Sequence, residues 1–245
     1  MNLKIAVAQV PSVKGNISKN IETHLLAIEK ASTLGVSYIV FPELSLTGYE
    51  PELAIKLAFS PDDKRLKPLI NAAIKNNIKI GVGAPLNNHG DSKIGLIVIS
   101  STGSIDIYEK MHLHSGEDAF FSKGASHYSL TINQTKIANA ICADTNHESH
   151  VRHCFELGAS VYIAGVLITA GGYESDTQAL EYYARKYNML VAIANHTQST
   201  GGWAPIGKSA IWSNKGLLVR ACETQSALLV AEKVSDEWCG QTFAI

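Results

Sequence analysis

A chain of 245 residues is long enough to bury a sizeable core, and α/β folds of this size often form one domain. Hydrophobic residues make up 46% of the chain and charged residues 18%, a composition that excludes a disordered or fibrous protein. The formal net charge is −1, and no run of five like charges occurs. This balance gives no electrostatic reason to expect binding to nucleic acid or to an acidic membrane.

The amino-terminal segment and the cysteines favour a cytoplasmic protein with reduced thiols. The opening MNLKIAVAQVPSVKG carries an apolar run that Gln9 and Pro11 interrupt, which is typical of a buried strand rather than a signal peptide. No later apolar stretch is long enough to span a bilayer. The four cysteines form no Cys-x-x-Cys pair and indicate no disulfide framework.

Short apolar runs rich in valine and isoleucine alternate with stretches of helical period in the first half of the chain. Gly35 favours the end of a helix, Pro61-Asp62-Asp63 the start of one, and Ser101-Thr102-Gly103 a hairpin turn. The expected order is a strand at 4–10, a helix at 18–34, a strand at 37–42, a helix at 62–77, a strand at 79–84, and a hairpin of strands 94–100 and 105–110.

The second half repeats this order of elements without repeating the residues. The pattern predicts a strand at 137–142, a helix at 148–157, a strand at 161–166, a helix at 177–187, a strand at 190–195, a hairpin of strands 210–213 and 217–222, and a strand at 227–233 beside that hairpin. Two sheets that each carry helices on one face can bury their bare faces against each other. The sequence therefore predicts a four-layer α-β-β-α sandwich, formed as a single domain by residues 1–245.

Three ionisable residues stand where apolar strand runs end. Glu43 closes SYIVFPE, Lys110 closes SIDIYEK, and Cys142 closes IANAIC. Ligands and catalytic groups gather at the carboxyl ends of strands in open α/β sheets, and partial burial there shifts pKa values. Each residue alone is ordinary, since chains often meet water at a strand end and a strand-end cysteine often packs as a small apolar residue. Their combination is what indicates function.

Cysteine, glutamate and lysine together are sufficient for acyl transfer. A thiolate is the attacking form of cysteine, and a neighbouring carboxylate can take the thiol proton and later give it to a leaving amine. A lysine ammonium stabilises the thiolate and the oxyanion of a tetrahedral intermediate. The set requires no metal and no organic cofactor.

Three sequence segments around these residues resemble the signature segments of the nitrilase superfamily, the carbon–nitrogen hydrolases. They are FPELSLTGYEP at 41–51, YEKMHL at 108–113 and ICAD at 141–144. Weaker similarities cover almost the whole chain: KIAVAQV near the start, FELGASVYIA, VAIANH, and GKSAIWSNKGLLV near the end. The resemblance implies the same four-layer sandwich that the element order predicts.

The resemblance also implies residue roles. Glu43 is expected to be the general base, Lys110 the oxyanion stabiliser and Cys142 the nucleophile, with the backbone N–H of Ala143 as a further oxyanion donor. The stretch GEDAFFSKG at 116–124 resembles the loop that carries a second glutamate in the amidase and carbamoylase branches. This similarity assigns Glu117 to positioning the substrate and the hydrolytic water; the alternative is a solvated loop acid.

The substrate is less determined than the chemistry. Tyr49, His196 and Trp203 are expected to line the pocket. Asn146 stands where many family members have an arginine, which weakens the case for the usual carboxylate-bearing substrate. True nitrilases usually carry a longer carboxyl-terminal extension, whereas this chain ends soon after its last expected strand. We therefore expect an enzyme acting on a small linear amide. Carbamoyl amides, nitriles, glutamine as an ammonia source, and a catalytically silent binding protein on the same scaffold remain alternatives. The resemblance further implies a homo-oligomer, most simply a homodimer.

A phosphate-loop pattern, G-x-x-x-x-G-K-S, occurs at 202–209. Such a loop binds phosphate only when it follows a strand and opens a helix. Here Ser209 leads into a segment with the pattern of a strand and hairpin, so nucleotide binding is not expected.

The histidines offer two further alternatives. His147, His150 and His153 are spaced by three along an expected helix with Cys154 adjacent, but a zinc site needs further ligands that the sequence does not nominate. We therefore expect a solvated or interface helix face and no metal. Cys–His catalysis would pair Cys142 with a histidine, the candidates being His112, His114 and His196, but the segments around Glu43 and Lys110 favour the Cys–Glu–Lys interpretation.

Overall fold

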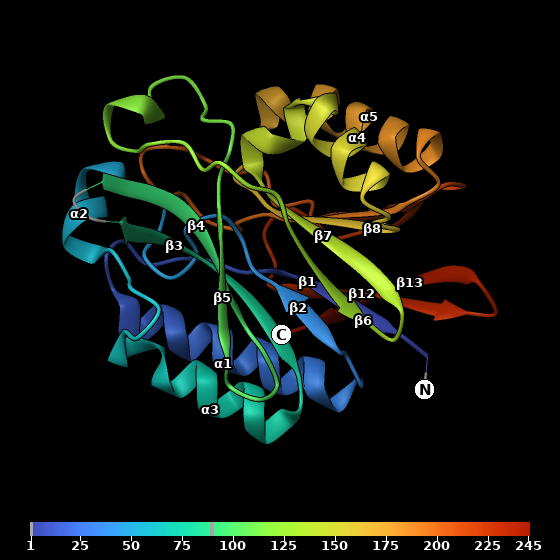
Figure 1. Ribbon diagram of the computed structural model, residues 1–245, viewed down its shortest axis with the longest axis horizontal. Helices are drawn as coiled ribbons and strands as arrows, with labels where there is room; N and C mark the ends of the chain where they lie inside the picture. Colours follow the sequence, from blue (N-terminus) through green and yellow to red (C-terminus); the bar gives the residue numbers. More distant parts are fainter. Residues whose placement is uncertain (1, 89–90) are drawn as a thin grey trace.

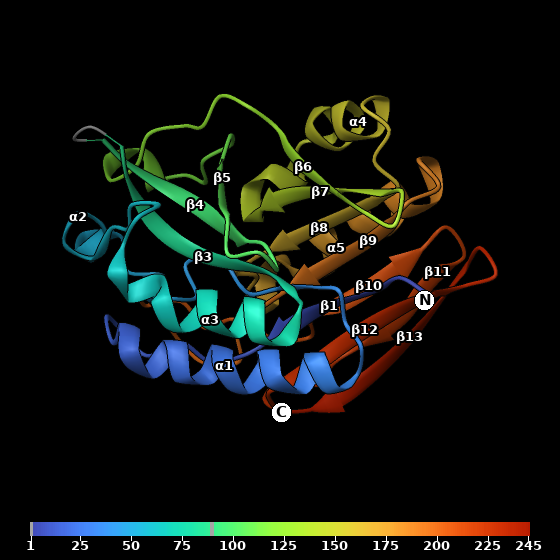
Figure 2. The same ribbon diagram turned by 60° about the horizontal axis from the view of Figure 1, so that its bottom comes forward.

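The computed structural model describes residues 2–88 and 91–245, and it shows two mixed β-sheets packed face to face between two layers of helices (Figure 1 and Figure 2). The seven-stranded sheet has the order β13-β12-β1-β2-β3-β4-β5, and the six-stranded sheet the order β11-β10-β9-β8-β7-β6. Helices α1 and α3 cover the outer face of the first sheet, and α4 and α5 that of the second. The predicted four-layer α-β-β-α sandwich is confirmed.

The first half of the chain forms most of the seven-stranded sheet. Its elements are β1 (Lys4–Gln9), α1 (Ile17–Thr33), β2 (Tyr38–Val40), the short α2 (Ala54–Leu57), α3 (Lys67–Asn76), β3 (Lys79–Asn88), β4 (Asp91–Ile99) and β5 (Ile105–Glu109). Strands β1, β2 and β3 are parallel, and β4 is antiparallel to both β3 and β5. The carboxyl ends of β2 and β5 therefore lie at the same edge of the sheet.

The second half forms the other sheet. Its elements are β6 (Tyr128–Ile132), β7 (Thr135–Ile141), α4 (Glu148–Glu156), β8 (Val161–Gly165), α5 (Ala170–Lys186), β9 (Leu190–Ala194), β10 (Ala210–Ser213) and β11 (Gly216–Arg220). Strands β7, β8 and β9 are parallel. The repeated order of elements in the two halves is thus present in the structure.

Alternating side chains explain the layers. In β1, Ile5 and Val7 point into the core between the sheets, while Ala6 and Ala8 pack under α1 and α3. The two outward-facing residues of β1 are alanines, so their small side chains let the helices pack close to this strand. One polar contact joins the two sheets within the apolar layer: the Tyr38 hydroxyl donates to the Asn139 side-chain oxygen at 2.6 Å.

The strand at 227–233 was assigned to the wrong sheet. It is β12 (Ala227–Val234), and it pairs antiparallel with β1 in the first sheet rather than with the neighbouring hairpin of the second. β13 (Glu237–Ala244), which the sequence did not predict, pairs with β12 as an edge strand. The apolar period of a strand shows that it is half-buried, but not which sheet it joins, and here the long-range pairing with β1 decides.

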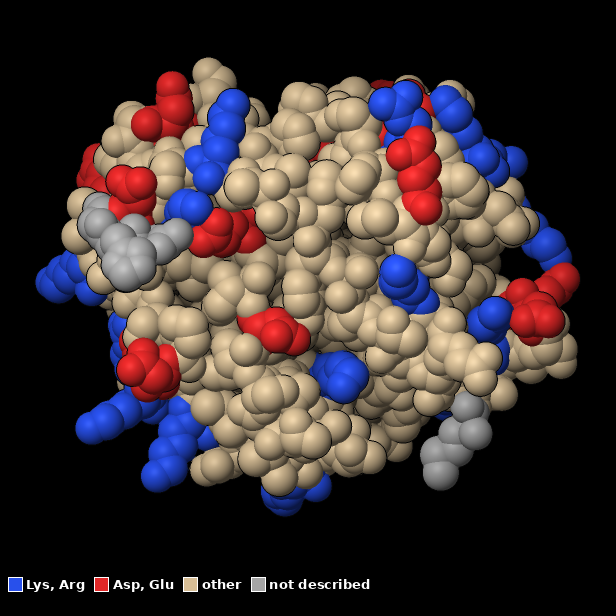
Figure 3. Space-filling view, viewed as in Figure 1, with Lys and Arg blue, Asp and Glu red and all other residues tan. Residues whose placement is uncertain are grey.

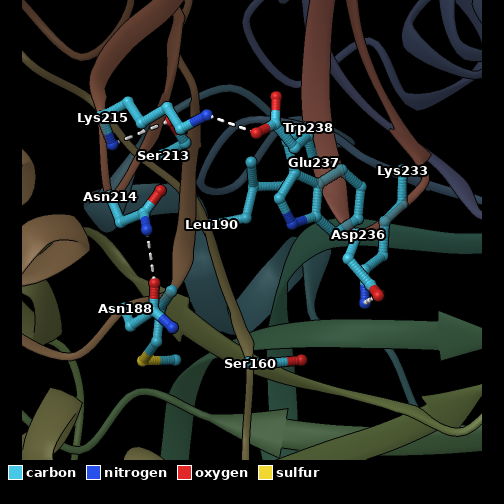
Figure 4. A pocket seen from close by; sticks show the side chains of 11 residues that line it. Ser160, Asn188, Leu190, Ser213, Asn214, Lys215, Lys233, Asp236, Glu237 and Trp238 are labelled. Carbon is cyan, nitrogen blue, oxygen red and sulfur yellow. Dashed lines mark hydrogen bonds and ion pairs between the residues drawn. The ribbon is translucent and has the colours of Figure 1, made fainter.

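The chain thus passes from β11 in the second sheet to β12 in the first, which brings the ends of the two sheets together. A polar cavity of about 280 Å³ lies where the β12–β13 hairpin meets the β10–β11 hairpin (Figure 4). Across it Lys215 forms an ion pair with Glu237, and the Asn214 amide donates to Asn188 at 2.6 Å. These contacts tie the hairpin of the second sheet to the edge strand of the first.

Several predicted boundaries shift for local reasons. The helix expected at 62–77 begins at Lys67, because the Asp63 carboxylate caps the amide of Arg65 in a preceding 3₁₀ turn. The strand expected to end at 84 extends to Asn88, and the strand expected to begin at 94 starts at Asp91, so that β3 and β4 pair antiparallel over this added length. The strand at 128–132 was missed. α5 starts at Ala170, seven residues earlier than expected. The sequence does not indicate this start, because the first turn contains two glycines, which are poor helix formers.

No helix in the described part of the chain is long and apolar enough to cross a membrane. On the face shown in Figure 3, lysine, arginine and acidic side chains are scattered over the middle and the margin, and neither sign forms a continuous patch. This distribution agrees with the formal net charge of −1.

Candidate active site

The buried ammonium group of Lys110 joins the strand-end residue Glu43 to Glu117 in the loop after β5. Lys110 Nζ lies 2.7 Å from Glu43 Oε1 and 2.7 and 2.8 Å from the two carboxylate oxygens of Glu117. Lys110 is fully buried, and both glutamates are almost so. Glu117 is therefore not a solvated loop acid: the Tyr49 hydroxyl donates to its Oε1 at 2.7 Å, and the His114 amide donates to its Oε2 at 2.7 Å.

The segment that carries Glu43 passes between the two sheets in close contact with both. A side chain at Gly83 in β3 would overlap the Pro42 carbonyl and the Leu44 amide, and one at Gly165 in β8 would overlap the Phe41 carbonyl. Only glycine allows this approach of three backbones. The tight turn after β2, in which Leu44 has a φ of 52°, then directs the Glu43 side chain toward Lys110.

His196, in the segment after β9, contacts the backbone of the same segment. Its Nε2 lies 2.8 Å from the Glu43 carbonyl oxygen, and its Nδ1 lies 3.4 Å from the Ser12 hydroxyl. Burial lowers the pKa of His196 to about 4, so the neutral ring donates from Nε2. The expectation that His196 lines the pocket is therefore not met: the side chain is fully buried and positions Glu43 through its backbone.

Cys142 lies immediately after β7, at the start of a 3₁₀ turn, with a φ of 42°. A positive φ is strained for a residue with a side chain, and strain of this kind clusters at functional sites. The thiol contacts the Leu167 carbonyl oxygen at 3.7 Å. The amide of Ala143 is the next N–H of the turn, and amides in a first helical turn lack a partner within the turn, so it remains the candidate oxyanion donor.

Asp144 connects the cysteine turn to the segment after Lys110. Its Oδ2 accepts hydrogen bonds from the Ile141 amide at 3.0 Å and the Tyr108 hydroxyl at 2.6 Å, and its Oδ1 accepts from the amides of Met111 and His112. The His112 ring also contacts Oδ1, at 3.1 Å. This fully buried carboxylate ties the turn of Cys142 to the segment after Lys110.

The electrostatics of the site favour a neutral thiol and a proton-accepting glutamate. Burial raises the pKa of Glu43 to about 7, although Lys110 acts to lower it. Burial also raises the pKa of Cys142 well above its ordinary value, and the nearby Glu43 raises it further. Burial lowers the pKa of Lys110, but Glu43, Cys142 and Glu117 more than offset this and keep it charged. The thiolate therefore forms only as its proton moves to a base.

A cavity of about 210 Å³ opens onto this cluster. Its lining consists of Glu43, Tyr49, His114, Glu117, Cys142, Asn146, Leu167, Ile168, Thr169, Gly172, Asp176 and Trp203. Tyr49 and Trp203 lie where the sequence predicted them, Tyr49 deep and Trp203 about half-exposed at the rim. Asp176 and Gly172 were missed because the amino-terminal turns of α5 were not recognised as helix.

The structure also places the residues of the other sequence alternatives. Ser209 is followed by strand β10, so the G-x-x-x-x-G-K-S segment opens no helix. The three histidines weighed as partners of Cys142 have other contacts: His112 with Asp144, His196 with Glu43, and His114 with the Ser115 carbonyl at 3.1 Å. On α4, His150 is buried rather than solvated, whereas His153 is exposed.

Comparisons with known proteins identify the family of this chain. The carbon–nitrogen hydrolase profile matches residues 4–238, almost the whole chain. The chain belongs to the carbon–nitrogen hydrolase family. Among relatives, it is 26% identical to a nitrilase of Pyrococcus abyssi over 94% of this chain and 89% of the relative. It is 24% and 27% identical to glutamine-dependent NAD(+) synthetases of Thermotoga maritima and Aquifex aeolicus, and it spans about a third of their length (34% and 32%).

Solved structures of the amidase from Nesterenkonia sp. AN1 share the fold. A mutant with the acetamide moiety of fluoroacetamide added to its active-site cysteine gives a TM-score of 0.88 at 20% identity, covering 96% of this chain and 91% of the amidase chain. A mutant in complex with butyramide gives 0.87 at 21% identity, covering 96% and 92%. At this identity the likeness establishes the nitrilase-like fold.

The raised pKa of Glu43 predicts an acid limb in the pH profile of this carbon–nitrogen hydrolase. As the candidate general base, Glu43 is expected to act in its deprotonated form, so kcat/KM for carbon–nitrogen bond hydrolysis should fall as the pH drops through about 7. The variant Glu43→Gln should lose about 10²–10⁴-fold in kcat/KM and lack this limb. Initial rates from pH 5 to 9 measure both. The control Glu174→Gln, an exposed acid of α5, should keep the profile. An unchanged acid limb in Glu43→Gln contradicts the assignment.

Proposed function

We propose that this chain hydrolyses the carbon–nitrogen bond of a small linear amide through a thioester on Cys142. The observation that carries the proposal is the ammonium of Lys110, held between Glu43 and Glu117, two carboxylates that line a cavity together with Cys142. A cavity of about 210 Å³ suits a substrate of few atoms. The amidase with the shared fold binds butyramide and acrylamide in its solved complexes, which supports amides as the first class to test.

In the acylation step, Cys142, Glu43 and Lys110 act together. Cys142 Sγ attacks the amide carbon while its proton passes to Glu43, and the carbonyl oxygen gains negative charge next to Lys110 and the amide of Ala143. Glu43 then gives the proton to the departing nitrogen, so the carbon–nitrogen bond breaks and ammonia or an amine leaves. Oε2 of Glu43 is buried and has no hydrogen-bond partner among the described residues, so its lone pairs remain available for this transfer.

Deacylation reverses the role of Glu43. The carboxylate takes a proton from water, the water oxygen attacks the thioester carbon, and the thiol is restored as the carboxylic acid leaves. Glu117 is held in place by Tyr49 and the amide of His114, so it cannot swing away as the charge changes. We assign it the role of fixing Lys110 and orienting the substrate and the water.

Carbamoyl amides and nitriles use the same nucleophile and remain alternatives. The similarity to a nitrilase over nearly the full chain keeps nitriles in any substrate screen. A silent binding protein is disfavoured, because such a scaffold has no need of a buried lysine between two buried carboxylates.

The thioester is the direct test of the proposed function. Incubation of the protein with a panel of short amides, followed by rapid acid quenching, should give an adduct on Cys142 whose mass equals that of the acyl group. The variant Cys142→Ala should form no adduct and release no ammonia, whereas Cys222→Ser, which changes an exposed cysteine outside the cavity, should match the parent. Ammonia release by Cys142→Ala above the buffer rate would exclude the mechanism.

The cavity also carries a carboxylate that the cluster does not use. Asp176 lies half-buried in the lining, where its Oδ1 contacts the Ser175 hydroxyl at 3.5 Å. Burial raises the pKa of Asp176, so a cation in the cavity would favour its charged form. Together with the absence of arginine at Asn146, this favours a substrate with a positive charge, such as an amino-acid amide. The glutamine-dependent relatives add glutamine to the substrates to test: its ammonium matches Asp176, but its carboxylate meets no arginine at position 146, so an amino-acid amide is the preferred candidate.

The variant Asp176→Asn tests this preference. It should raise KM for glycinamide or glutamine about fivefold, as expected for the loss of about 1 kcal/mol of ion pairing at a half-exposed site, and should leave KM for butyramide within twofold. Steady-state ammonia release measures all three substrates. An equal rise in KM for butyramide would show that Asp176 shapes the cavity rather than recognising charge.

A further inference from the structure

Three ligand-type side chains meet outside the catalytic cavity, where α4 packs against the segment before β6. They are His127, His150 and Cys154, whose ligand atoms all lie within 4.8 Å of one another. His150 and Cys154 are one turn apart on the buried face of α4, and His127 comes from a different element. The histidine spacing on α4 lacked a further ligand in the sequence, and the fold supplies it from residue 127.

The nitrogen atoms of both histidines are suited to bind a cation. His127 Nε2 is buried, and within the described chain it has no hydrogen-bond partner. His150 Nε2 lies 2.9 Å from the Tyr108 hydroxyl, whose own proton goes to Asp144 at 2.6 Å. Nε2 must therefore carry the proton of the neutral ring, and the lone pair is on Nδ1, the atom 4.0 Å from Cys154 Sγ. The Tyr162 hydroxyl, 2.9 Å from Nδ1, can rotate its proton away.

We propose that His127, His150 and Cys154 form a binding site for a divalent cation of the zinc class. Two imidazoles and a thiolate are ligands that Zn²⁺ prefers, and structural zinc sites complete a tetrahedron with a fourth ligand. Water would complete the tetrahedron, or His153 after a side-chain rotation, since its exposed ring lies 4.2 Å from that of His127. Tetrahedral zinc holds such donors about 3.3–3.8 Å apart, so the side chains need to move by about 1 Å or less.

The surroundings match those of a metal-bound histidine. A ligating histidine usually donates its second ring N–H to an anchored acceptor, and here that N–H points to Tyr108, which Asp144 anchors. Because Asp144 also holds the turn of Cys142, a cation at this site would brace α4 against the segment that carries the nucleophile.

Cobalt binding tests the site in full-length, untagged protein. The Cys142→Ala background removes the catalytic thiol as a competing ligand. Titration with Co²⁺ should give one bound ion per chain with a thiolate-to-cobalt charge-transfer band, and Zn²⁺ should displace it and raise the thermal unfolding midpoint. Adding Cys154→Ser should abolish the band, while the matched control Cys222→Ser should retain it. His127→Ala should weaken binding by about tenfold or more.

The alternative outcomes are equally clear. The absence of stoichiometric binding, or a band that survives Cys154→Ser, would overturn the proposal. If Cys154→Ser does not fold, His127→Ala decides the matter, because His127 lies on a loop and is only partly buried; unchanged Co²⁺ affinity in that variant would also overturn it. None of these measurements depends on hydrolytic activity, so they stand or fall independently of the proposed function.

Discussion

A lysine ammonium buried between two carboxylates is the interaction on which the rest of this structure depends. Lys110, Glu43 and Glu117 are all withdrawn from water, and removing charges from water costs more than an ion pair normally returns. The imbalance is visible in Glu43, whose second oxygen has no hydrogen-bond partner in the described chain and whose pKa burial raises to about 7. A carboxylate in this condition takes up a proton readily, which is the property that a general base needs.

The fold maintains this cluster by fixing each contributor to a strand end. Glycines at 83 and 165 let the Glu43 segment pass between the sheets, and His196 holds its backbone from the second sheet. Asp144 then couples the strained turn of Cys142 to the segment after Lys110. The two sheets thus contribute separate halves of one site, and their face-to-face packing sets its dimensions.

The sequence predicted most of what depends on local pattern. Strand and helix periods located the layers, and the residues that close three strand runs proved to be neighbours in space, Glu43 and Lys110 in direct contact. What it could not predict depends on long-range contact. The apolar period of 227–233 does not specify β1 as its partner, and nothing near His196 indicates that it supports Glu43 rather than the substrate.

Two omissions have a different origin. The sequence does not indicate that Asp176 lies on a helix, because the glycines at 171 and 172 are poor helix formers. In the structure both glycines belong to α5, which packs against the second sheet. His127 stands in a segment without periodicity, so only the fold shows that it meets His150 and Cys154. The neighbours that make both residues candidates come from elements distant in the sequence, so the sequence pattern alone does not identify them.

The central claim is that the buried cluster is retained for chemistry rather than for stability, and unfolding free energies test it most directly. Lys110→Met alone leaves two carboxylates without their counter-ion and should cost about 3–5 kcal/mol. The triple variant Lys110→Met/Glu43→Gln/Glu117→Gln removes all three charges, so its unfolding free energy in urea should return to within about 1 kcal/mol of the parent or exceed it. It should release no ammonia from any amide. A triple variant that is as unstable as Lys110→Met, or one that still hydrolyses amides, would contradict the account.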